Sequence, residues 1–317
     1  MRIEAENLHK RYGEVTALDG LSLSIPPETT FGVLGTNGAG KTTLFELLVG
    51  LDRPDEGTLT VGGREVEEAG TWLRDRIGYL PEHVGFPAGL TGREVLRFNA
   101  RVRGISEQGR IPEVLDTVGL DPEAADRAVS GYSNGMGRRL GLAGALLARP
   151  SVLILDEPTA GLDPRGVAEF HRIVERVRER TDATVVLSSH VLGEVERLCD
   201  RVAIFHDGRV VAEGSVDELV GSEEITVQLR PADAEDAPAL HEAASTVAEA
   251  STAAEPVTVD CPPERMPTLF AALDGGVELG GVTVERDGLE GAFHEAVPGD
   301  HEAVPGDRES IRKEVDA

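Results

Sequence analysis

The sequence predicts an α/β fold whose main domain is built on a mostly parallel sheet. Short apolar segments alternate with helical patterns through the first two thirds of the chain, which is typical of parallel sheets covered by helices on both faces. After about Leu219 the composition changes to a stretch rich in Ala, Glu, Asp and Val, which indicates a second, smaller α/β domain. The length of 317 residues fits one large domain and one small one.

The N-terminal part reads as β-strands followed by a strand, a loop and a helix. Residues 1–34 hold short β segments with turns, which predict an antiparallel β subdomain. The apolar strand TTFGVLG enters a glycine-rich loop, and TLFELLVGL leaves it as an amphipathic helix. Residues 90–148 contain helical patterns separated by Gly, Pro and Asp, so we expect an inserted helical subdomain at about 83–149.

The remaining elements complete the sheet and the small domain. SVLILDEP and TVVLSSH read as buried strands, each followed by a helix, and RVAIFHDGRVVAEGS reads as a hairpin with its turn at Asp207 and Gly208. These elements place the main domain at 1–219. An accessory α/β domain is expected at 220–293, in the order strand, helix, strand, helix, strand.

The last residues, 294–317, carry a tandem HEAVPGD repeat. Such short units with Pro-Gly in each cannot build a packed core, so we expect an acidic, disordered tail. His294 and His301 recur with the repeat. A solvated duplication is the favoured interpretation of these histidines, and weak metal binding is the alternative.

Composition and charge exclude several classes of protein. The net charge of −26 and the pI of about 4.6 offer no basic surface to nucleic acid. No stretch reaches the roughly 18 consecutive apolar residues that cross a bilayer, and the N-terminus lacks an apolar signal core. Cys199 and Cys261 lie far apart in the sequence, which excludes a disulfide scaffold. We expect a soluble, cytoplasmic protein, for which any membrane role must come through a partner.

The segment GTNGAGKT at 35–42 fits the phosphate-loop pattern G-x-x-x-x-G-K-[ST]. Its glycines let backbone N–H groups converge on phosphate oxygens, and the next helix points its N-terminus at the same anion. Lys41 can reach the β- and γ-phosphates, and Thr42 can offer its hydroxyl to Mg²⁺. The pattern predicts a P-loop NTPase core, and a glycine-rich turn without a ligand is the alternative. The nucleotide-binding residues expected here are Gly35, Thr36, Asn37, Gly38, Ala39, Gly40, Lys41, Thr42 and Thr43.

A second acidic element, VLILDE at 152–157, supplies carboxylates at the end of an apolar strand. Ligands of α/β sheets bind in the crevice at the carboxyl ends of the strands. Asp156 is therefore expected to hold Mg²⁺ through water, and Glu157 to polarise the attacking water as general base. Ordinary capping of a turn or helix by this acidic pair is the alternative.

With these two elements placed, residues 1–219 resemble the nucleotide-binding domain of ABC transporters. The resemblance implies that Tyr12 in RYGEV stacks on adenine and that His190 in SSH contacts the γ-phosphate as a catalytic residue. YSNGMGRRL resembles the family's signature segment, which assigns a second phosphate contact to Ser133, Asn134 and Gly135, and AGLDP resembles its D-loop, with Asp163. Taken singly, Tyr12 also fits a packing role, His190 a structural one and Ser133 a simple N-cap.

The chain departs from the family pattern at two positions. Asn134 stands where the family often has Gly or Lys, and its backbone can still serve. Glu82 follows GYLP where the family usually has Gln. An ionised Glu is only an acceptor, so Glu82 is expected to bind Mg²⁺ or water. The expected metal residues are Thr42, Glu82 and Asp156.

The resemblance also implies a mechanism. Two such domains dimerise head to tail, each ATP lies between the phosphate loop of one and the signature of the other, and hydrolysis opens the pair. ATP and Mg²⁺ are the implied cofactors. The implied partners are a second copy or a homologous ATPase subunit and a separately encoded transmembrane permease, docked near Glu82 and the stretch 90–110. The protein would then be peripheral on the inner face of the cell membrane, with no nucleic-acid partner.

Two local segments are similar to ATPase subunits of exporter-like systems, with the Nos-type system of nitrous-oxide reductase maturation as the nearest. They are GYLPEHVGFPAGLTGREVLRFNARVRG and SSHVLGEVERLCDRVAIFHDG. No residue names the transported substrate. A soluble ABC ATPase of translation or DNA repair is the alternative function. The accessory domain is either a sensor or a structural appendage.

The acidic surface predicts adaptation to high salt, because at about 1 M salt the Debye length falls to about 3 Å and repulsion between like charges is largely screened. Lysine is nearly absent, with Lys10, Lys41 and Lys313 as its only occurrences. We expect the melting temperature to rise when KCl is increased from low to molar concentration. A melting curve that is the same at both concentrations would contradict this expectation and favour an ordinary acidic cytosolic protein.

Overall fold

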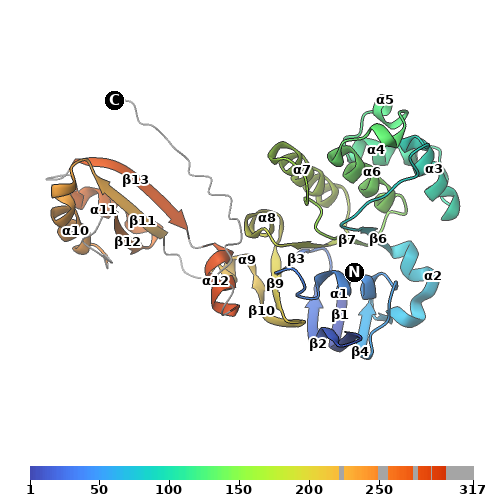
Figure 1. Cartoon of the computed structure of the whole chain (residues 1–317), viewed down its shortest axis with the longest axis horizontal. Coiled ribbons are helices and arrows are strands. Elements are labelled where there is room, and N and C mark those ends of the chain that lie inside the picture. Colours follow the sequence, from blue (N-terminus) through green and yellow to red (C-terminus); the bar gives the residue numbers. More distant parts are fainter. Residues whose placement is uncertain (221–224, 249–255, 274–277, 287, 298–317) are drawn as a thin grey trace. The chain divides into compact units, whose positions relative to one another are not determined.

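The computed structural model (Figure 1) describes residues 1–220, 225–248, 256–273, 278–286 and 288–297. The chain divides into two compact units, residues 1–216 and residues from 217 onward. No helix in the described ranges is both long and apolar enough to cross a membrane.

The N-terminal strands form the antiparallel subdomain that the sequence predicts. Its sheet has the order β2-β1-β4-β5, in which every pairing is antiparallel. Alternating side chains such as Ile3 and Ala5 are buried on one face, as expected for a sheet with one solvated side. The strands are β1 (Ile3–Tyr12), β2 (Val15–Ile25), β4 (Glu56–Val61) and β5 (Arg64–Glu65).

The central sheet has the order β10-β9-β3-β8-β7-β6 and is parallel except for β10. Its middle strands are buried along their whole length, which explains their uninterrupted apolar sequences. β9 and β10 form the expected hairpin, with Asp207 and Gly208 at φ of 47° and 73° in the two-residue turn. The strands are β3 (Thr30–Gly35), β6 (Ile77–Leu80), β7 (Val152–Leu155), β8 (Thr184–Ser189), β9 (Arg201–His206) and β10 (Arg209–Ser215).

Helices cover this sheet and join it to the β subdomain. The apolar face of α1 (Lys41–Leu48) packs in one core with residues of both sheets. α7 (Pro164–Arg180) and α8 (Leu192–Leu198) follow β7 and β8. The sequence did not predict α2 (Val66–Arg76), whose apolar residues are few and whose helical geometry is broken at Gly70, at φ of 50°.

The helical subdomain is inserted between β6 and β7, and its helices gather on one side of the central sheet in Figure 1. Thr91 and Glu94 form a capping box that starts α3. α6 lies against β6, where a Cβ on Gly141 would come within 2.7 Å of Leu80. The helices are α3 (Gly92–Val102), α4 (Arg110–Thr117), α5 (Pro122–Ala125) and α6 (Asn134–Leu146), with the 3-10 turn η1 (Val129–Gly131) before α6.

The second unit has a core of its own around a three-stranded antiparallel sheet of order β12-β11-β13. α10 packs on this sheet and against α11, burying side chains such as Leu240 and Leu269. The elements are α9 (Val216–Leu219), β11 (Ile225–Pro231), η2 (Ala234–Asp236), α10 (Ala237–Ser245), β12 (Val257–Cys261), η3 (Pro263–Arg265), α11 (Met266–Leu273), β13 (Leu279–Arg286) and α12 (Leu289–Ala296).

The prediction that the disordered tail starts at residue 294 is wrong. Residues 294–296 belong to α12, and the side chain of Phe293 and the next residue after the helix, Val297, are both buried. Burial of these apolar side chains explains why the helix forms in spite of the repeat. The rest of the expected tail, including His301, lies outside the described residues.

Candidate functional site

The glycine-rich loop joins β3 to α1. β3 ends at Gly35 and α1 begins at Lys41. Gly38 and Gly40 have φ of 87° and 99°, and a Cβ on Gly40 would lie 2.5 Å from the carbonyl oxygen of Ala17, so only glycine fits there. The first turn of α1 has no side-chain cap and no acidic residue, which leaves its N–H groups available to an anion.

This loop lines a cavity of about 340 Å³. All the loop residues that the sequence predicts except Gly35 face it, together with two of the predicted acidic residues. The lining consists of Val15, Ala17, Thr36, Asn37, Gly38, Ala39, Gly40, Lys41, Thr42, Thr43, Glu82 and Glu157.

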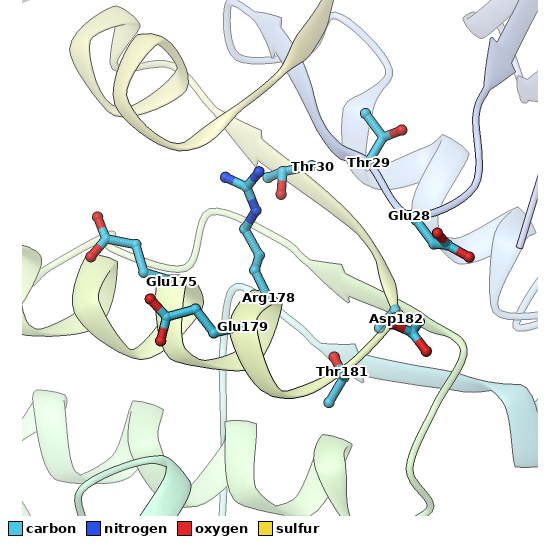
Figure 2. A pocket seen from close by; sticks show the side chains of 9 residues that line it. Glu28, Thr29, Thr30, Glu175, Arg178, Glu179, Thr181 and Asp182 are labelled. Atoms are coloured by element: carbon cyan, nitrogen blue, oxygen red, sulfur yellow. The ribbon is translucent and has the colours of Figure 1, made fainter.

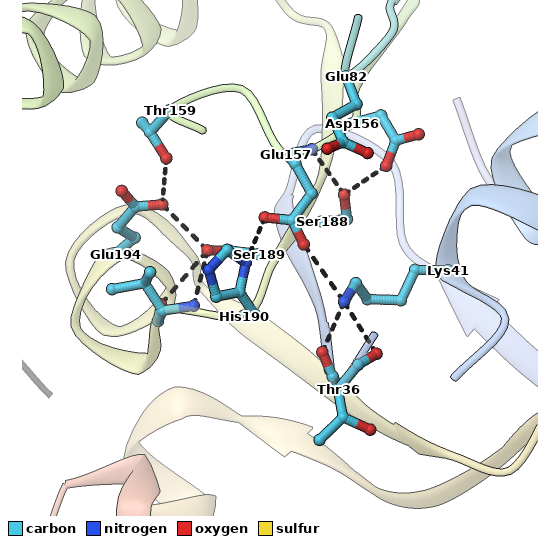
Figure 3. Close-up of polar contacts among 12 residues, drawn as sticks. Thr36, Lys41, Glu82, Asp156, Glu157, Thr159, Ser188, Ser189, His190 and Glu194 are labelled. Carbon is cyan, nitrogen blue, oxygen red and sulfur yellow. Dashed lines mark hydrogen bonds and ion pairs between the residues drawn. The ribbon is translucent and has the colours of Figure 1, made fainter. Parts of the chain in front are cut away.

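Lys41 is a buried cation in the lining of this cavity, and Figure 3 shows its polar contacts. Its Nζ donates to the carbonyl oxygens of Gly35 at 2.5 Å and Thr36 at 3.3 Å. The same Nζ lies 3.2 Å from Oε1 of Glu157, whose carboxylate is equally buried. A buried ammonium needs a nearby anion, and Glu157 supplies it.

Asp156 follows β7 and is 1% exposed. Ser188 donates its hydroxyl to Oδ1 at 2.7 Å, Tyr79 donates to Oδ2 at 3.4 Å, and the Thr42 side chain also hydrogen-bonds this carboxyl. Burial is the largest influence and raises the pKa of Asp156, while the hydrogen bonds from Ser188 and Thr42 oppose the rise. The structure therefore brings Thr42 and Asp156 into contact at the end of the sheet.

Glu157 is held in an unusual backbone conformation, with φ of 41°. Its N–H donates to Ser188 Oγ at 2.8 Å. Its Oε2 lies 2.8 Å from Nδ1 of His190, the residue that follows β8 and whose side chain is 44% exposed. A non-glycine residue with positive φ is strained and persists only where its surroundings fix it, and such residues cluster at functional sites.

Sequence reasoning missed several residues that shape this site. Ser188 connects Asp156 to the backbone of Glu157, and the polar pair that ends the apolar strand TVVLSS was its signal. Arg138, on α6, donates to the carbonyl oxygen of Glu157 at 3.2 Å, and nothing in the local sequence announced this contact. Glu194 accepts hydrogen bonds from Thr159 at 2.7 Å and Ser189 at 3.0 Å, so it connects the loops that follow β7 and β8.

The signature and D-loop residues form a separate group. Ser133 caps α6 by accepting from Met136 N at 3.3 Å, and Asp163 caps α7 by accepting from Gly166 N at 2.7 Å. Asn134 donates its side-chain amide to the carbonyl oxygen of Gly161 at 3.3 Å. Together with Gly135 they line a cavity of about 450 Å³ that shares no lining residue with the phosphate-loop cavity.

Tyr12 lies at the end of β1 beside the phosphate loop. Its hydroxyl donates to Asp52 at 2.8 Å and its side chain also hydrogen-bonds Thr43. Burial and the neighbouring carboxylate raise the pKa of Tyr12 to about 12. Tyr12 is 45% exposed and pairs across the strands with Val15, which lines the cavity, whereas Tyr12 itself is not among the lining residues.

Another hollow, of about 450 Å³, lies at the opposite end of the sheet, where β3 begins and α7 ends (Figure 2). Its side chains include Glu28, Glu175, Glu179 and Asp182 against a single Arg178. It has no glycine-rich loop, and its acidic lining does not suit a phosphate. The phosphate-loop cavity is therefore the better nucleotide site.

Comparison with known proteins agrees with this geometry. Residues 18–160 match a family model described as ABC transporter. The bacitracin transport ATP-binding protein of Bacillus licheniformis is 41% identical over 68% of this chain and 71% of its own length. A daunorubicin resistance ATP-binding protein of Streptomyces coeruleorubidus is 42% identical over 73% of this chain and 74% of its own. The chain belongs to the ABC transporter ATP-binding family.

Solved structures of this family share the fold. An ATP-binding subunit of an ABC transporter superposes with a TM-score of 0.62 at 30% identity, covering 69% of this chain and 92% of its own. A dimeric bacterial ABC transporter cassette gives a TM-score of 0.62 at 24% identity, which is evidence for the fold alone. These superpositions cover about two thirds of this chain.

Burial of Asp156 should make stability depend on pH. An unfolded Asp ionises near pH 4, whereas the folded pKa is raised, so the free energy of unfolding falls as pH rises from about 4 through the folded pKa. We expect Asp156→Asn to escape this loss and to gain stability over the wild type towards neutral pH. Urea unfolding from pH 4 to 8 in molar KCl measures it, with the exposed Asp116→Asn as control. A stability difference that does not change with pH would contradict the expectation.

Proposed function

We propose that this chain is the ATP-binding and ATP-hydrolysing subunit of an ABC membrane exporter. One observation carries the proposal: the phosphate loop, Asp156, Glu157 and His190 converge at the carboxyl end of one parallel sheet. Membership of the ABC family supports it. Export is supported by relatives such as the Nod factor export ATP-binding protein of Paraburkholderia xenovorans, which is 41% identical.

The donor groups suit ATP with Mg²⁺. The loop N–H groups and Lys41 provide positive charge for the phosphates. Thr42 and Asp156 contribute hard oxygen ligands side by side, and Glu82 faces the same cavity. Mg²⁺ prefers this kind of site, with one or two carboxylates and the rest water and phosphate. When bound, Mg²⁺ neutralises the charge that develops on the phosphate oxygens.

The proposed reaction is attack of water on the γ-phosphorus. A bond forms from the water oxygen to phosphorus, the bond to the β-γ bridging oxygen breaks, and Glu157 takes the proton from water. His190 orients Glu157 through its Nδ1 contact and can reach the γ-phosphate from its exposed side. Lys41, which is already aligned on Glu157, moves its charge to the γ-phosphate when ATP binds.

A second copy completes the site. The signature group of Ser133, Asn134 and Gly135 lines a cavity that shares no lining residue with the phosphate-loop cavity of its own chain. The N-terminus of α6, a helix of 13 residues, is a suitable anion site for a phosphate from outside. We propose that ATP bound on one copy is closed over by the signature and Asp163 of the other.

The helical subdomain offers a surface for the membrane partner. Phe98 and Val102 are 64% and 71% exposed and lie four residues apart on α3, so they form one apolar strip. A permease that docks on this strip would hold the subunit at the cytoplasmic face of the membrane. Charged neighbours on the same helix, Arg97 and Arg101, would set its orientation.

The large negative charge supports one finer proposal, that the protein works at molar salt. Its net charge is −26. The ion pairs within the described residues include exposed ones, such as Arg180 with Asp116, that contribute little when screened. The buried pairs at the phosphate loop are screened far less, so the site keeps its electrostatics at high salt.

The Glu157→Gln variant tests the ATPase proposal. Glutamine has the same size but cannot take a proton, so turnover should fall by about two to four orders of magnitude while ATP binding persists. Steady-state phosphate release and binding of a fluorescent ATP analogue measure the two effects. Size-exclusion chromatography should show a dimer trapped by ATP and Mg²⁺.

The control for this experiment is Glu179→Gln, a solvent-facing change at the opposite end of the sheet. It should leave phosphate release unaltered. Full ATPase activity in Glu157→Gln would remove Glu157 as the general base. Absence of nucleotide binding by the wild type would overturn the proposed function itself.

Membrane association tests the docking strip. Replacing Phe98 and Val102 by Asp places charges on the apolar strip and should reduce the share of tagged protein recovered with host membranes by about tenfold. ATPase activity of the purified variant should persist. Leu51→Asp, on an equally exposed apolar residue outside the helical subdomain, is the matched control. Equal membrane recovery of both variants would reject the strip.

A further inference from the structure

Arg138 is a buried arginine that the proposed chemistry does not use. It lies on α6, five residues after the cap residue Ser133, and is 7% exposed. Its Nη1 donates to the carbonyl oxygen of Pro81 at 2.7 Å and its Nη2 to the carbonyl oxygen of Glu157 at 3.2 Å. The guanidinium therefore ties the signature helix to two backbone segments of the catalytic edge.

The hydrogen bond from Arg138 to the Glu157 carbonyl acts on the residue of the site whose backbone is strained. Glu157 has a φ of 41°, and its peptide groups are fixed on both sides. Ser188 accepts from its N–H, while its carbonyl oxygen accepts from Arg138 and from the N–H of Ala160. A strained conformation survives only when several contacts determine it, and Arg138 is the one among these that comes from another subdomain.

The hydrogen bond from Arg138 to the Pro81 carbonyl acts on the segment that carries Glu82. Pro81 and Glu82 directly follow β6, and Glu82 lines the phosphate-loop cavity. Arg138 and Glu82 also share a groove of about 550 Å³ with Ser133. Burial lowers the pKa of Arg138, and the negative charges of Glu82, Asp156 and Glu157 partly oppose this shift.

We propose that Arg138 is a positioning residue for the general base, which holds Glu157 and the Pro81–Glu82 segment in place from the helix that begins at the signature. The proposal rests on the ATPase function proposed above. Within the described part of the chain, the hydrogen bonds of Arg138 go to backbone carbonyls, so its role is to set where the Glu157 carboxylate lies. Removing it should slow the chemical step and leave nucleotide binding by the phosphate loop nearly unaltered.

Arg110, the first residue of α4, provides a matched control, because it contacts the C-terminal end of α6, the helix that carries Arg138. Arg110 also donates from its guanidinium to two backbone carbonyls, those of Leu146 and Leu147. Its side chain is 13% exposed, and it lines none of the cavities described above. Arg110→Met thus removes the same kind of contact from α6 without approaching Glu157.

The experiment compares wild type, Arg138→Met, Arg138→Lys and Arg110→Met in MgATP hydrolysis, binding of a fluorescent ATP analogue and thermal unfolding. Arg138→Met should lower kcat by about ten- to a hundredfold, with KM and the analogue Kd within about threefold of wild type. Arg138→Lys keeps the charge and part of the hydrogen bonding, so its kcat should lie between the two. Arg110→Met should lower the melting temperature by a similar amount and keep kcat within about twofold of wild type.

Two results would overturn the proposal. One is an Arg138→Met kcat equal to wild type; the other is a kcat that falls in both methionine variants in proportion to melting temperature. If Arg138→Met does not fold, Arg138→Lys decides, since an unaltered kcat in that variant also rejects the role. Failure of the ATPase function is distinguishable, because then wild type itself would not hydrolyse ATP or Glu157→Gln would remain active.

Discussion

The ion pair between Lys41 and Glu157 is the contact on which the rest of the site depends. Both groups are buried, and the opposite charge of each offsets part of the cost of burying the other. Lys41 begins α1 after the loop that follows β3, whereas Glu157 follows β7. These strands are not neighbours, because β8 lies between them. The strand order therefore sets the distance that the two long side chains must span. Between them, β8 carries Ser188, and His190 follows directly after this strand.

The two ends of the central sheet differ in how their charged side chains are buried and paired. At the carboxyl ends, charged groups are buried and each is matched by a partner: Lys41 with Glu157, and Asp156 with Ser188. At the amino ends, the acidic side chains around Arg178 are open to solvent and need no such matching. Burial makes interactions stronger and also makes any loss of a partner costly. A ligand that carries negative charge and enters beside Lys41 therefore has a large effect on Glu157.

The sequence could predict the elements that repeat a local rule. Alternation of apolar strands and helices indicated the parallel sheet, and the glycine pattern located the loop between β3 and α1. It could not predict contacts that depend on how distant elements meet. Arg138 approaches Glu157 only because α6 packs on β6, and Gly141 permits that approach. The assignments of Ser133 and Asp163 stay predictions. Ser133 caps its helix, as its simpler alternative required, and Asp163 caps a helix as well.

Stability and function conflict at this edge of the sheet. Asp156 is buried at a cost that grows as it ionises, and Glu157 keeps a backbone conformation that most residues avoid. A chain selected for stability alone would place neutral residues with ordinary φ at both positions. Contacts from three elements hold the two residues in place without removing these costs. They come from Ser188, Tyr79 and Arg138. In the proposed reaction, the carboxylates are thereby held in advance where Mg²⁺ and the attacking water would bind, so reorganisation need not accompany the chemical step.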